Sequence, residues 1–223
     1  MKNFVQETRR SEKALMINAV LVDYLNKEIK NLKILDIGCG NGEIANFFAK
    51  NNKVLTCDIQ DQRKDKTNNN FKLIKKNKAD LPYKDNFFDI VISNHVIEHI
   101  TTAEQGKHIE EIKRVLKENG ILYLSTENWF FPIEPHYKIP LIHYLPKKIF
   151  FRILKLLKLF KEDIFLLNYF RLNRMLNAYR NKTEYTDRII RDAKKYQVNL
   201  KSIPIYSNKF NFLVPTNVFV VIK

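Results

Sequence analysis

Three glycines at alternate positions constrain the fold of this chain more than any other feature of its sequence. The stretch LDIGCGNGE, residues 35–43, places Gly38, Gly40 and Gly42 directly after a short apolar run. Glycine adopts left-handed backbone conformations at no steric cost and lets the backbone approach a ligand closely. A helical pattern follows at once, and its first amides can point at that ligand. Because Glu43 stands one residue after this triplet, where the nicotinamide fingerprint G-x-G-x-x-G requires its third glycine, the spacing disfavours a dinucleotide.

Short apolar runs alternate with helical patterns through much of the chain, and this alternation predicts an α/β fold. We expect helices from Ser11, at 42–51 and at 103–118, and strands at 33–38, 53–59, 71–75, 88–94 and 121–127. Parallel strands joined by crossover helices form a doubly wound sheet. Extended runs near 200–207 and 216–222 would complete seven strands as an antiparallel hairpin at the sheet edge. With domains averaging about 150 residues, the whole chain, 1–223, is expected to be a single domain with an insertion.

The segment 128–197 differs from the alternating part in composition. Its first part is stiffened by Pro132, Pro135, Pro140 and Pro146, and the remainder is helical, Lys-rich and aromatic. Open α/β sheets bind ligands at the carboxyl ends of their strands, and loops at that edge often carry function. We therefore interpret 128–197 as a helical lid inserted over that edge.

The net charge of +15 is unevenly distributed. Residues 127–223 carry 18 basic and 7 acidic side chains, a net charge of +11, whereas residues 1–126 carry the remaining +4. Such a field attracts phosphates, acidic substrates or anionic membranes. The codon bias of an AT-rich genome is the alternative explanation for the many lysines.

Two cysteines, Cys39 and Cys57, form no C-x-x-C pair, which excludes a disulfide scaffold and a Cys-rich zinc module and favours a reducing compartment. The N-terminal sequence lacks the apolar region of a signal peptide, and no apolar stretch approaches the length of a transmembrane helix. We therefore expect a cytoplasmic protein that is soluble, or at most peripheral at the inner membrane surface.

Several motifs of the first half occur in the order and spacing of a known family. Asp58 ends the second expected strand, 20 residues after Gly38, and Asp80-Leu81 follows in KADLPYKDNFFD. Asp89-Ile90-Val91 begins the fourth strand, and SNHVIEH and EEIKRVLKENGILYLST come next. Over about residues 30–127 the chain resembles the class I S-adenosylmethionine-dependent methyltransferases, which have a Rossmann-like fold, and among them the small-molecule and quinone-biosynthesis type.

This resemblance implies S-adenosylmethionine as the cofactor. In the family, the glycine loop cradles the methionine part, an acidic residue in the place of Asp58 binds both ribose hydroxyls, and a pair in the place of Asp80-Leu81 contacts adenine. Two carboxylate oxygens suit a cis-diol, which offers two donors. Asp36 is expected to hold the glycine loop by hydrogen bonds, with direct contact as the alternative, and Cys39 to fill space beside it. The predicted cofactor-binding residues are Asp36, Gly38, Cys39, Gly40, Asp58, Ile59, Asp80, Leu81 and Asn94.

The sequence His95-Val96-Ile97-Glu98-His99 spells H-x-x-E-H, the inverted zinc-protease pattern. The resembled family often ends the turn after its fourth strand in the same way, and no downstream acidic ligand motif follows. We therefore expect no metal. His95 is predicted to face the sulfonium of the cofactor as a catalytic residue, while His99 packs behind the strand.

The insertion begins NWFFPIEPHYKIPLIHYLP, where Glu134 and His136 are candidate bases. An unperturbed imidazole is half-neutral near physiological pH, and methyl transfer to an alcohol needs a base. The alternative is that both side chains only satisfy backbone groups of the loop. The sequence Ser93-Asn94-His95-Val96 stands where exocyclic-amine methyltransferases have an N-P-P-[FY] tetrad, which disfavours methylation of base amino groups.

KKIFFRILKLLKLFK, residues 147–161, contains six basic and no acidic residues and predicts a basic amphipathic helix. Three interpretations stay open. The helix could lie on an anionic membrane, receive a phosphorylated or nucleic-acid substrate, or pack its apolar face on the domain with its lysines in water.

The expected function is methyl transfer from S-adenosylmethionine to a hydroxyl on a small or lipid-linked acceptor, such as a sugar or a polyketide- or quinone-like compound. The segment 128–197 would bind this acceptor. An RNA methyltransferase, suggested by charge alone, and a non-catalytic cofactor-binding regulatory protein are the alternatives. Nucleic acid is the less favoured partner, and the oligomeric state stays open.

Overall fold

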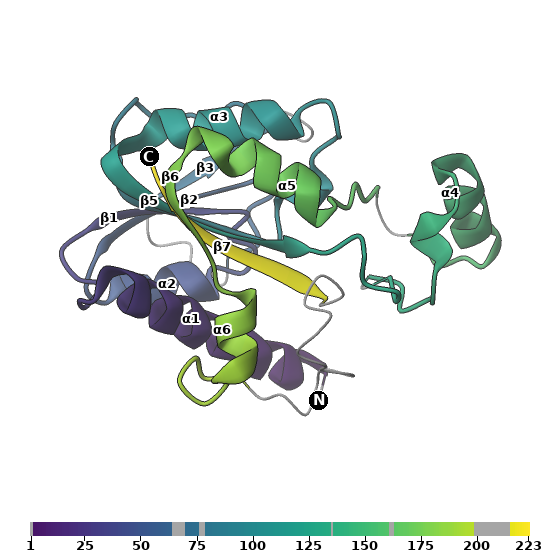
Figure 1. Ribbon diagram of the computed structural model, residues 1–223, viewed down its shortest axis with the longest axis horizontal. Coiled ribbons are helices and arrows are strands. Elements are labelled where there is room, and N and C mark those ends of the chain that lie inside the picture. The colour runs from purple at the N-terminus through teal and green to yellow at the C-terminus, as the bar shows by residue number, and fades with distance from the viewer. Residues whose placement is uncertain (1, 64–69, 76–78, 135, 161–162, 199–214) are drawn as a thin grey trace.

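The computed structural model describes residues 2–63, 70–75, 79–134, 136–160, 163–198 and 215–223. A seven-stranded sheet of order β3-β2-β1-β4-β5-β7-β6 forms its centre (Figure 1). Every strand runs parallel to its neighbour except β7, which is antiparallel to both β5 and β6. The strands are β1 (Lys33–Ile37), β2 (Lys53–Asp58), β3 (Phe71–Leu73), β4 (Phe88–Asn94), β5 (Leu116–Glu127), β6 (Arg180–Glu184) and β7 (Thr216–Ile222). The predicted fold class is confirmed.

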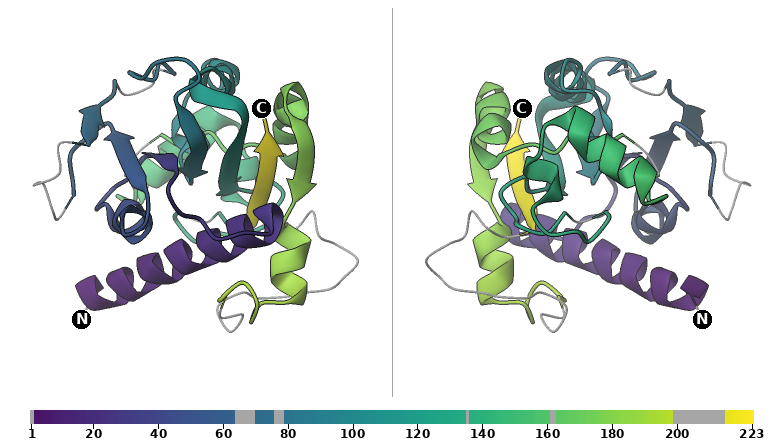
Figure 2. Two further views of the ribbon diagram at one scale, coloured as in Figure 1. Left: turned by 90° about the vertical axis from the view of Figure 1, so that its left-hand side faces the viewer. Right: turned by 90° about the vertical axis from the view of Figure 1, so that its right-hand side faces the viewer.

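Helices cover both faces of the sheet. On one face lie α1 (Lys2–Leu25), α2 (Glu43–Ala49) and α6 (Thr186–Arg191), and on the other lie α3 (Gln105–Val115) and α5 (Tyr169–Met175) (Figure 1). The end-on views of Figure 2 show α1 running across the full width of its face. Side chains along each strand point alternately to the two faces of the sheet, so one strand contributes to both helix layers. In β1, Ile34 packs towards α1 and α2, whereas Leu35 and Ile37 pack in the cluster with α3 and α5.

The strand order reverses at β1, which lies between β2 and β4. Ile37 at its end is in register with Cys57 of β2 and with Ser93 of β4. The residues that follow these three strands therefore meet at the carboxyl ends of the strands. The strand order reverses there, and an open α/β sheet binds its ligand at such a position. This register brings the glycine loop together with the ends of β2 and β4.

The far edge of the sheet differs from the expected hairpin. The antiparallel neighbour of β7 at the edge is β6, and the run predicted at 200–207 lies outside the described residues. Arg180–Glu184 reads RNKTE, with no apolar and no buried residue, so no apolar alternation marks it as a strand. The helix expected from Ser11 begins at Lys2, and the helix expected to reach residue 118 ends at Val115 because β5 begins at Leu116.

The segment 128–197 divides into two parts. Its second part supplies α5, β6 and α6 to the main body, whereas α4 (Lys147–Leu156) stands apart beyond the carboxyl end of β5 (Figure 1). Ile142, Phe150 and Leu154 form a small core of their own around α4. The predicted basic helix is thus present with a shorter range, while its action as a lid stays a prediction.

Candidate active site at the carboxyl ends of β1, β2, β4 and β5

The glycine loop adopts left-handed backbone conformations at all three glycines. The φ angles are 67° at Gly38, 51° at Gly40 and 83° at Gly42, which directly precedes α2. The Gly38 amide donates to the carbonyl of Cys57 at 2.8 Å, which joins the loop to β2. A Cβ atom at Gly38 would lie 2.6 Å from Cγ2 of Val96, so both backbone conformation and space require glycine there.

Asp58 at the end of β2 ties the glycine loop to its own strand. Its Oδ2 accepts a hydrogen bond from the Gly40 amide at 2.8 Å, and its Oδ1 accepts one from the Ile59 amide at 2.6 Å. Oδ1 also accepts from the Gln60 amide at 3.4 Å, so it is Oδ2 that keeps a further lone pair for a ligand. Ile59 is 42% exposed and places an apolar side chain beside this carboxylate.

Asp36 is buried beneath the same loop. Burial and the neighbouring Asp58 charge raise the pKa of Asp36 to about 8, although a hydrogen bond from the Ala45 amide opposes this rise. Ala45 lies in the first turn of α2, so Asp36 satisfies one of that turn's open donors. Oδ2 of Asp36 has no hydrogen-bond partner among the described residues. Burial raises the pKa of the Cys39 thiol to about 12, in keeping with a neutral side chain that fills space.

Asp80 and Leu81 have partners within the fold. Asp80 forms an ion pair with Lys107 at 2.8 Å, and both side chains are well exposed. Leu81 is buried, and its amide donates to Oε2 of Glu111 at 2.9 Å. The Leu81 amide is therefore already engaged by α3, and the contact of this pair with adenine stays a prediction that rests on the Asp80 carboxylate.

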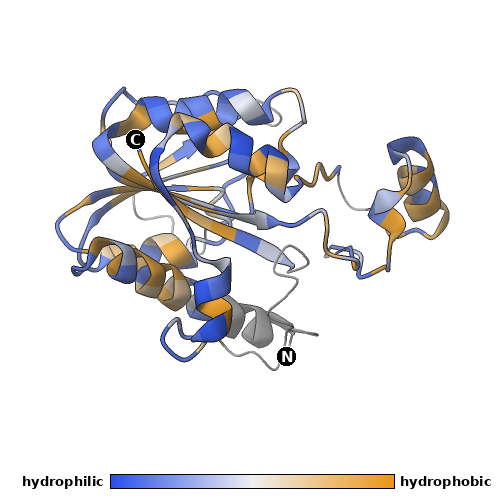
Figure 3. Cartoon of the chain, viewed as in Figure 1, coloured by the Kyte–Doolittle hydropathy of each residue, from blue (hydrophilic) through white to orange (hydrophobic). Residues whose placement is uncertain are grey.

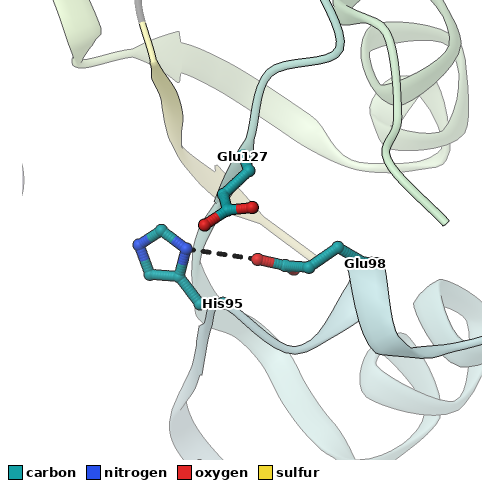
Figure 4. A group of neighbouring side chains, drawn as sticks. All are labelled: His95, Glu98 and Glu127. Atoms are coloured by element: carbon teal, nitrogen blue, oxygen red, sulfur yellow. Dashed lines mark hydrogen bonds and ion pairs between the residues drawn. The ribbon is translucent and has the colours of Figure 1, made fainter. Parts of the chain in front are cut away.

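His95 follows β4 in a left-handed conformation, with φ 55°. Its Nδ1 lies 3.1 Å from Oε1 of Glu98, which is fully buried (Figure 4). Oε2 of Glu98 accepts a hydrogen bond from the Thr126 hydroxyl at 3.0 Å. Burial alone would raise the pKa of Glu98, but the hydrogen bond and charge of His95 lower it below its ordinary value. An ionised carboxylate only accepts, so Nδ1 of His95 carries the proton and Nε2 of a neutral ring is an acceptor.

His136 lies between two carboxylates. Its Nδ1 is 2.8 Å from Oε2 of Glu127 and 3.2 Å from Oε1 of Glu134. Burial alone would lower the pKa of His136, but these two partners raise it to about 10. These partners favour the protonated ring, and the role of His136 as a base stays a prediction.

Glu134 is held by donors of its own loop, and its role as a base stays a prediction. It is buried, and its Oε2 accepts from the Tyr137 amide at 2.5 Å. Burial would raise the pKa of Glu134, but His136 and the Tyr137 amide together lower it below the ordinary range. This bonding corresponds to the alternative prediction for Glu134, in which the carboxylate satisfies backbone groups of the loop.

Glu127 joins these side chains into one imidazole–carboxylate network of His95, Glu98, Glu127, Glu134 and His136. The ligating atoms of His95, Glu98 and Glu127 lie within 4.8 Å of one another, as do those of Glu127, Glu134 and His136. Either set could hold a metal ion. His99 belongs to neither set, because Ile97–His99 forms a 3-10 turn and not the helix that H-x-x-E-H requires. The expected absence of a metal stays a prediction.

A cavity of about 240 Å³ adjoins the network on the side of α4. Glu134 lies on its wall, and the rest of the lining is mostly apolar and aromatic: Trp129, His143, Tyr144, Leu145, Lys147, Phe150, Ile164 and Leu166. A larger depression, of about 1080 Å³, lies at the amino ends of β1 and β2. The glycine loop lies at the other, carboxyl ends of these strands, so the depression plays no part in this site.

Comparison with known proteins matches part of the chain to one family. Residues 35–124 match the family described as "Methyltransferase domain". An uncharacterized protein of Methanocaldococcus jannaschii is 32% identical over 128 residues, which cover 57% of this chain and 52% of that protein. A ubiquinone biosynthesis O-methyltransferase of Pelagibacter ubique is 30% identical over 112 residues, covering 46% and 45%. The chain thus spans about half the length of the curated relatives it matches.

The fold extends this likeness to nearly the whole chain. The crystal structure of a SAM-dependent methyltransferase from Archaeoglobus fulgidus superposes with a TM-score of 0.56 and covers 94% of each chain at 16% identity. Residues 35–124 therefore resemble the methyltransferase family, and nearly the whole chain has the fold of a SAM-dependent methyltransferase. S-adenosylmethionine is the cofactor that this likeness implies.

The residues at the ends of β1 and β2 fit that cofactor. The second oxygen of buried Asp36 lacks a hydrogen-bond partner among the described residues, so it can accept a hydrogen bond from a ligand. A cationic ammonium such as that of a methionine moiety would favour the ionised form of this buried carboxyl and so lower its pKa. Asp58 keeps acceptor capacity for a diol.

The sequence did not assign roles to Glu98, Thr126 and Glu127. Glu98 was considered only as part of a metal pattern, and the other two end an apolar strand. Pairing of β4 with β5 carries Thr126 and Glu127 to the end of β4, beside His95 and Glu98. A carboxylate three residues after a histidine was the one local signal that could have identified the pair.

Proposed function

We propose that this methyltransferase transfers the methyl group of S-adenosylmethionine to a hydroxyl on a small or lipid-linked molecule, such as a sugar or a quinone-like compound. The observation that carries this proposal is the His95–Glu98 pair, which presents a basic ring nitrogen at the carboxyl end of β4. Curated O-methyltransferases of ubiquinone biosynthesis at about 30% identity support the same type of acceptor. We place the reaction in the cytoplasm, since Cys39 and Cys57 are both free thiols.

The chain's own residues supply the proton acceptor. A hydroxyl is a weak nucleophile while its proton remains, so its transfer to a positioned base accelerates attack. Nε2 of His95 accepts that proton, and the electron pair of the broken O–H bond stays on the oxygen. S-adenosylmethionine, when bound, would supply an activated methyl group: its bond to sulfur would break as the bond to the acceptor oxygen forms, and that electron pair would stay on the sulfur.

Glu98 and Thr126 position this base. The buried Glu98 carboxylate fixes the tautomer of His95 and stabilises the imidazolium that forms when the ring takes the proton. The Thr126 hydroxyl holds the other oxygen of Glu98 and so fixes the orientation of the carboxylate. The protonated ring of His136 compensates part of the charge of Glu127 and Glu134 nearby.

The test is methyl transfer from isotope-labelled cofactor to a panel of phenols, alkylated catechols, sugars and amines. We expect transfer to hydroxyl acceptors, and we expect His95→Gln to lower kcat by 10²- to 10⁴-fold, the contribution of a positioned base. His136→Gln is the matched comparison and should cost at least tenfold less. The proposal fails if amines are the acceptors, or if His95→Gln keeps full kcat while the cofactor affinity is unchanged.

A further inference from the structure

Exposed apolar side chains gather on one stretch of the chain around α4. Among the described residues, seven of the eleven large hydrophobic side chains that are strongly exposed lie between residues 141 and 159, and Leu156 reaches 81% exposure. Figure 3 shows this concentration of hydrophobic residues on the projecting helix. We name this surface the 141–159 face; its apolar members are Leu141, Tyr144, Leu145, Ile149, Leu156, Leu157 and Leu159.

The same face is uniformly basic. Exposed cations alternate with its apolar side chains, and residues 135–161 of the sequence include no Asp or Glu. Surfaces that combine aliphatic side chains with Lys and Arg partition into the interface of anionic bilayers. The basic members of the face are Lys147, Lys148, Arg152, Lys155 and Lys158.

The exposed side chains are not needed to hold α4 together. Phe150 and Leu154 are buried and pack with Ile142, so the helix already has a core on its other side. The projecting segment is also anchored at its base, where the Trp129 amide donates to the carbonyl of Leu167 at 3.1 Å. Apolar area that neither the small core nor the main body covers is the mark of an interaction surface.

The cavity of about 240 Å³ connects this face to the catalytic network. Tyr144 and Leu145 belong to the face and also line the cavity. Glu134 also lines the cavity. It lies within 4.8 Å of Glu127, which in turn lies within 4.8 Å of the ring of His95, measured between ligating atoms. The cavity therefore lies between the exposed face and Glu134, which is separated from the proposed base by one side chain, Glu127.

We propose that the 141–159 face docks on an anionic phospholipid bilayer, and that the cavity lined by Trp129 receives the apolar chain of an amphiphilic acceptor. The docking stands independently of the methyl-transfer chemistry. The acceptor class rests on the proposed function, because it assumes a hydroxylated headgroup at His95. The described helices include none long and apolar enough to cross a bilayer. Contact through a face of α4 requires no such helix.

The composition of the face favours lipid over RNA. Sites that bind nucleic acid combine cations with aromatic side chains that stack on bases. Here six of the seven exposed apolar residues are Leu or Ile, which offer no stacking plane and insert readily among acyl chains.

The first test is flotation with vesicles of phosphatidylglycerol and phosphatidylcholine, against vesicles of phosphatidylcholine alone. We expect flotation with the anionic vesicles only, weakened by salt. Each basic side chain near an anionic surface contributes about fivefold to binding, so Gln at 148, 152, 155 and 158 should lower it by roughly 100-fold or more. Gln at exposed Lys27, Lys50, Lys53 and Lys84 removes the same charge elsewhere and should lower it less than tenfold.

A second pair of variants tests the apolar part. Leu156→Ser with Leu157→Ser should abolish the flotation that survives in high salt, whereas Leu15→Ser with Leu73→Ser, also exposed, should leave it unchanged. Equal losses in the two pairs, or in the two Gln sets, would overturn docking through this face. So would retention of RNA by the wild type at salt concentrations that release it from the vesicles.

The cavity has its own reporter, because Trp129 is the only tryptophan of the chain and lines it. A phenol carrying a dodecyl chain should shift the fluorescence of Trp129 saturably, whereas phenol itself should not. Leu145→Arg, which places a charge in the lining, should remove the shift. No shift, or a shift unchanged by Leu145→Arg, would overturn the acceptor class. Because neither readout uses methyl transfer, a failure of the proposed chemistry would leave both signals in place.

Discussion

The glycine crevice, residues 33–63, and the projecting segment, residues 129–165, acquire their properties in different ways. In the crevice, strand register and backbone conformation place each group, and the Asp58 carboxylate bonds backbone amides of neighbouring residues. In the projecting segment, a small side-chain core supports a surface of exposed lysines and leucines. The difference indicates that the cofactor side depends on exact backbone geometry, whereas the acceptor side depends on the chemistry of replaceable side chains.

A methyl group at Gly38 should give the largest effect. Gly38→Ala must adopt φ 67° and brings its Cβ 2.6 Å from Val96, so we expect the free energy of unfolding to fall by roughly 2–4 kcal/mol. Binding of S-adenosylhomocysteine should fall at least tenfold. Chemical unfolding and calorimetric titration measure the two effects.

Adding Val96→Ala to that variant sharpens this prediction. The second change removes the contact with Cγ2 of Val96 and should recover part of the lost stability, leaving about 1–2 kcal/mol for the left-handed backbone. Gly106→Ala is the control, since no atom lies within 4 Å of its new Cβ. A Gly38→Ala variant as stable as the wild type would show that the crevice tolerates altered backbone geometry, contrary to the comparison.

Loss of the Asp58 carboxylate should have the next largest effect. Asp58→Ala removes the acceptor predicted for the ribose diol and also releases the Gly40 amide, so cofactor affinity should fall by roughly 1.5–3 kcal/mol. Asp85→Ala, an exposed aspartate paired with Arg114, is the matched control and should leave affinity unchanged. If calorimetry finds equal affinities for Asp58→Ala and the wild type, the ribose site lies elsewhere.

The stability that the imidazole–carboxylate network contributes should depend on pH. The folded pKa of His136 is raised to about 10 against roughly 6.5 for an unfolded histidine, so its ion pairs stabilise fully below about pH 6.5 and lose their effect as pH rises through 10. The difference in unfolding free energy between wild type and His136→Gln should be roughly 1–3 kcal/mol at pH 6 and close to zero above pH 10.

His143 provides a comparison, because its pKa is shifted in the direction opposite to that of His136. Burial lowers its pKa, outweighing the hydrogen bond to the Trp129 carbonyl, so the effect of His143→Gln should not decline between pH 7 and 10. Denaturant unfolding at several pH values measures both series. A His136 effect that is flat across this range would mean that the ring is not charged in the folded protein.

Chelation should have no effect on methyl transfer. Dialysis against a strong chelator, followed by the transfer assay, tests whether His95, Glu98 and Glu127 act as a base and its carboxylate neighbours or as metal ligands. The base interpretation predicts unchanged kcat. Stoichiometric metal lost together with activity would contradict it and would make the network a metal centre.

The same division explains how much could be predicted from sequence. Glycine spacing, strand alternation and Asp58 are local signals, and they predicted the sheet and the cofactor crevice. Strand β6 has no such signal, because an exposed edge strand does not need alternating apolar residues. The charge state of His136 depends on Glu127, which the fold brings beside it, so an imidazole considered alone was expected to be half-neutral. The core around Phe150 likewise arises only from tertiary contacts.

Calorimetric titration of the wild-type chain with S-adenosylhomocysteine and with NAD tests the central assignment most directly. A loop with glycines at 38, 40 and 42, closed by Asp58, should bind S-adenosylhomocysteine with a micromolar Kd, about −7 to −9 kcal/mol, and should not respond to NAD. Binding of NAD together with no binding of S-adenosylhomocysteine would contradict the assignment of this crevice to the methyltransferase cofactor.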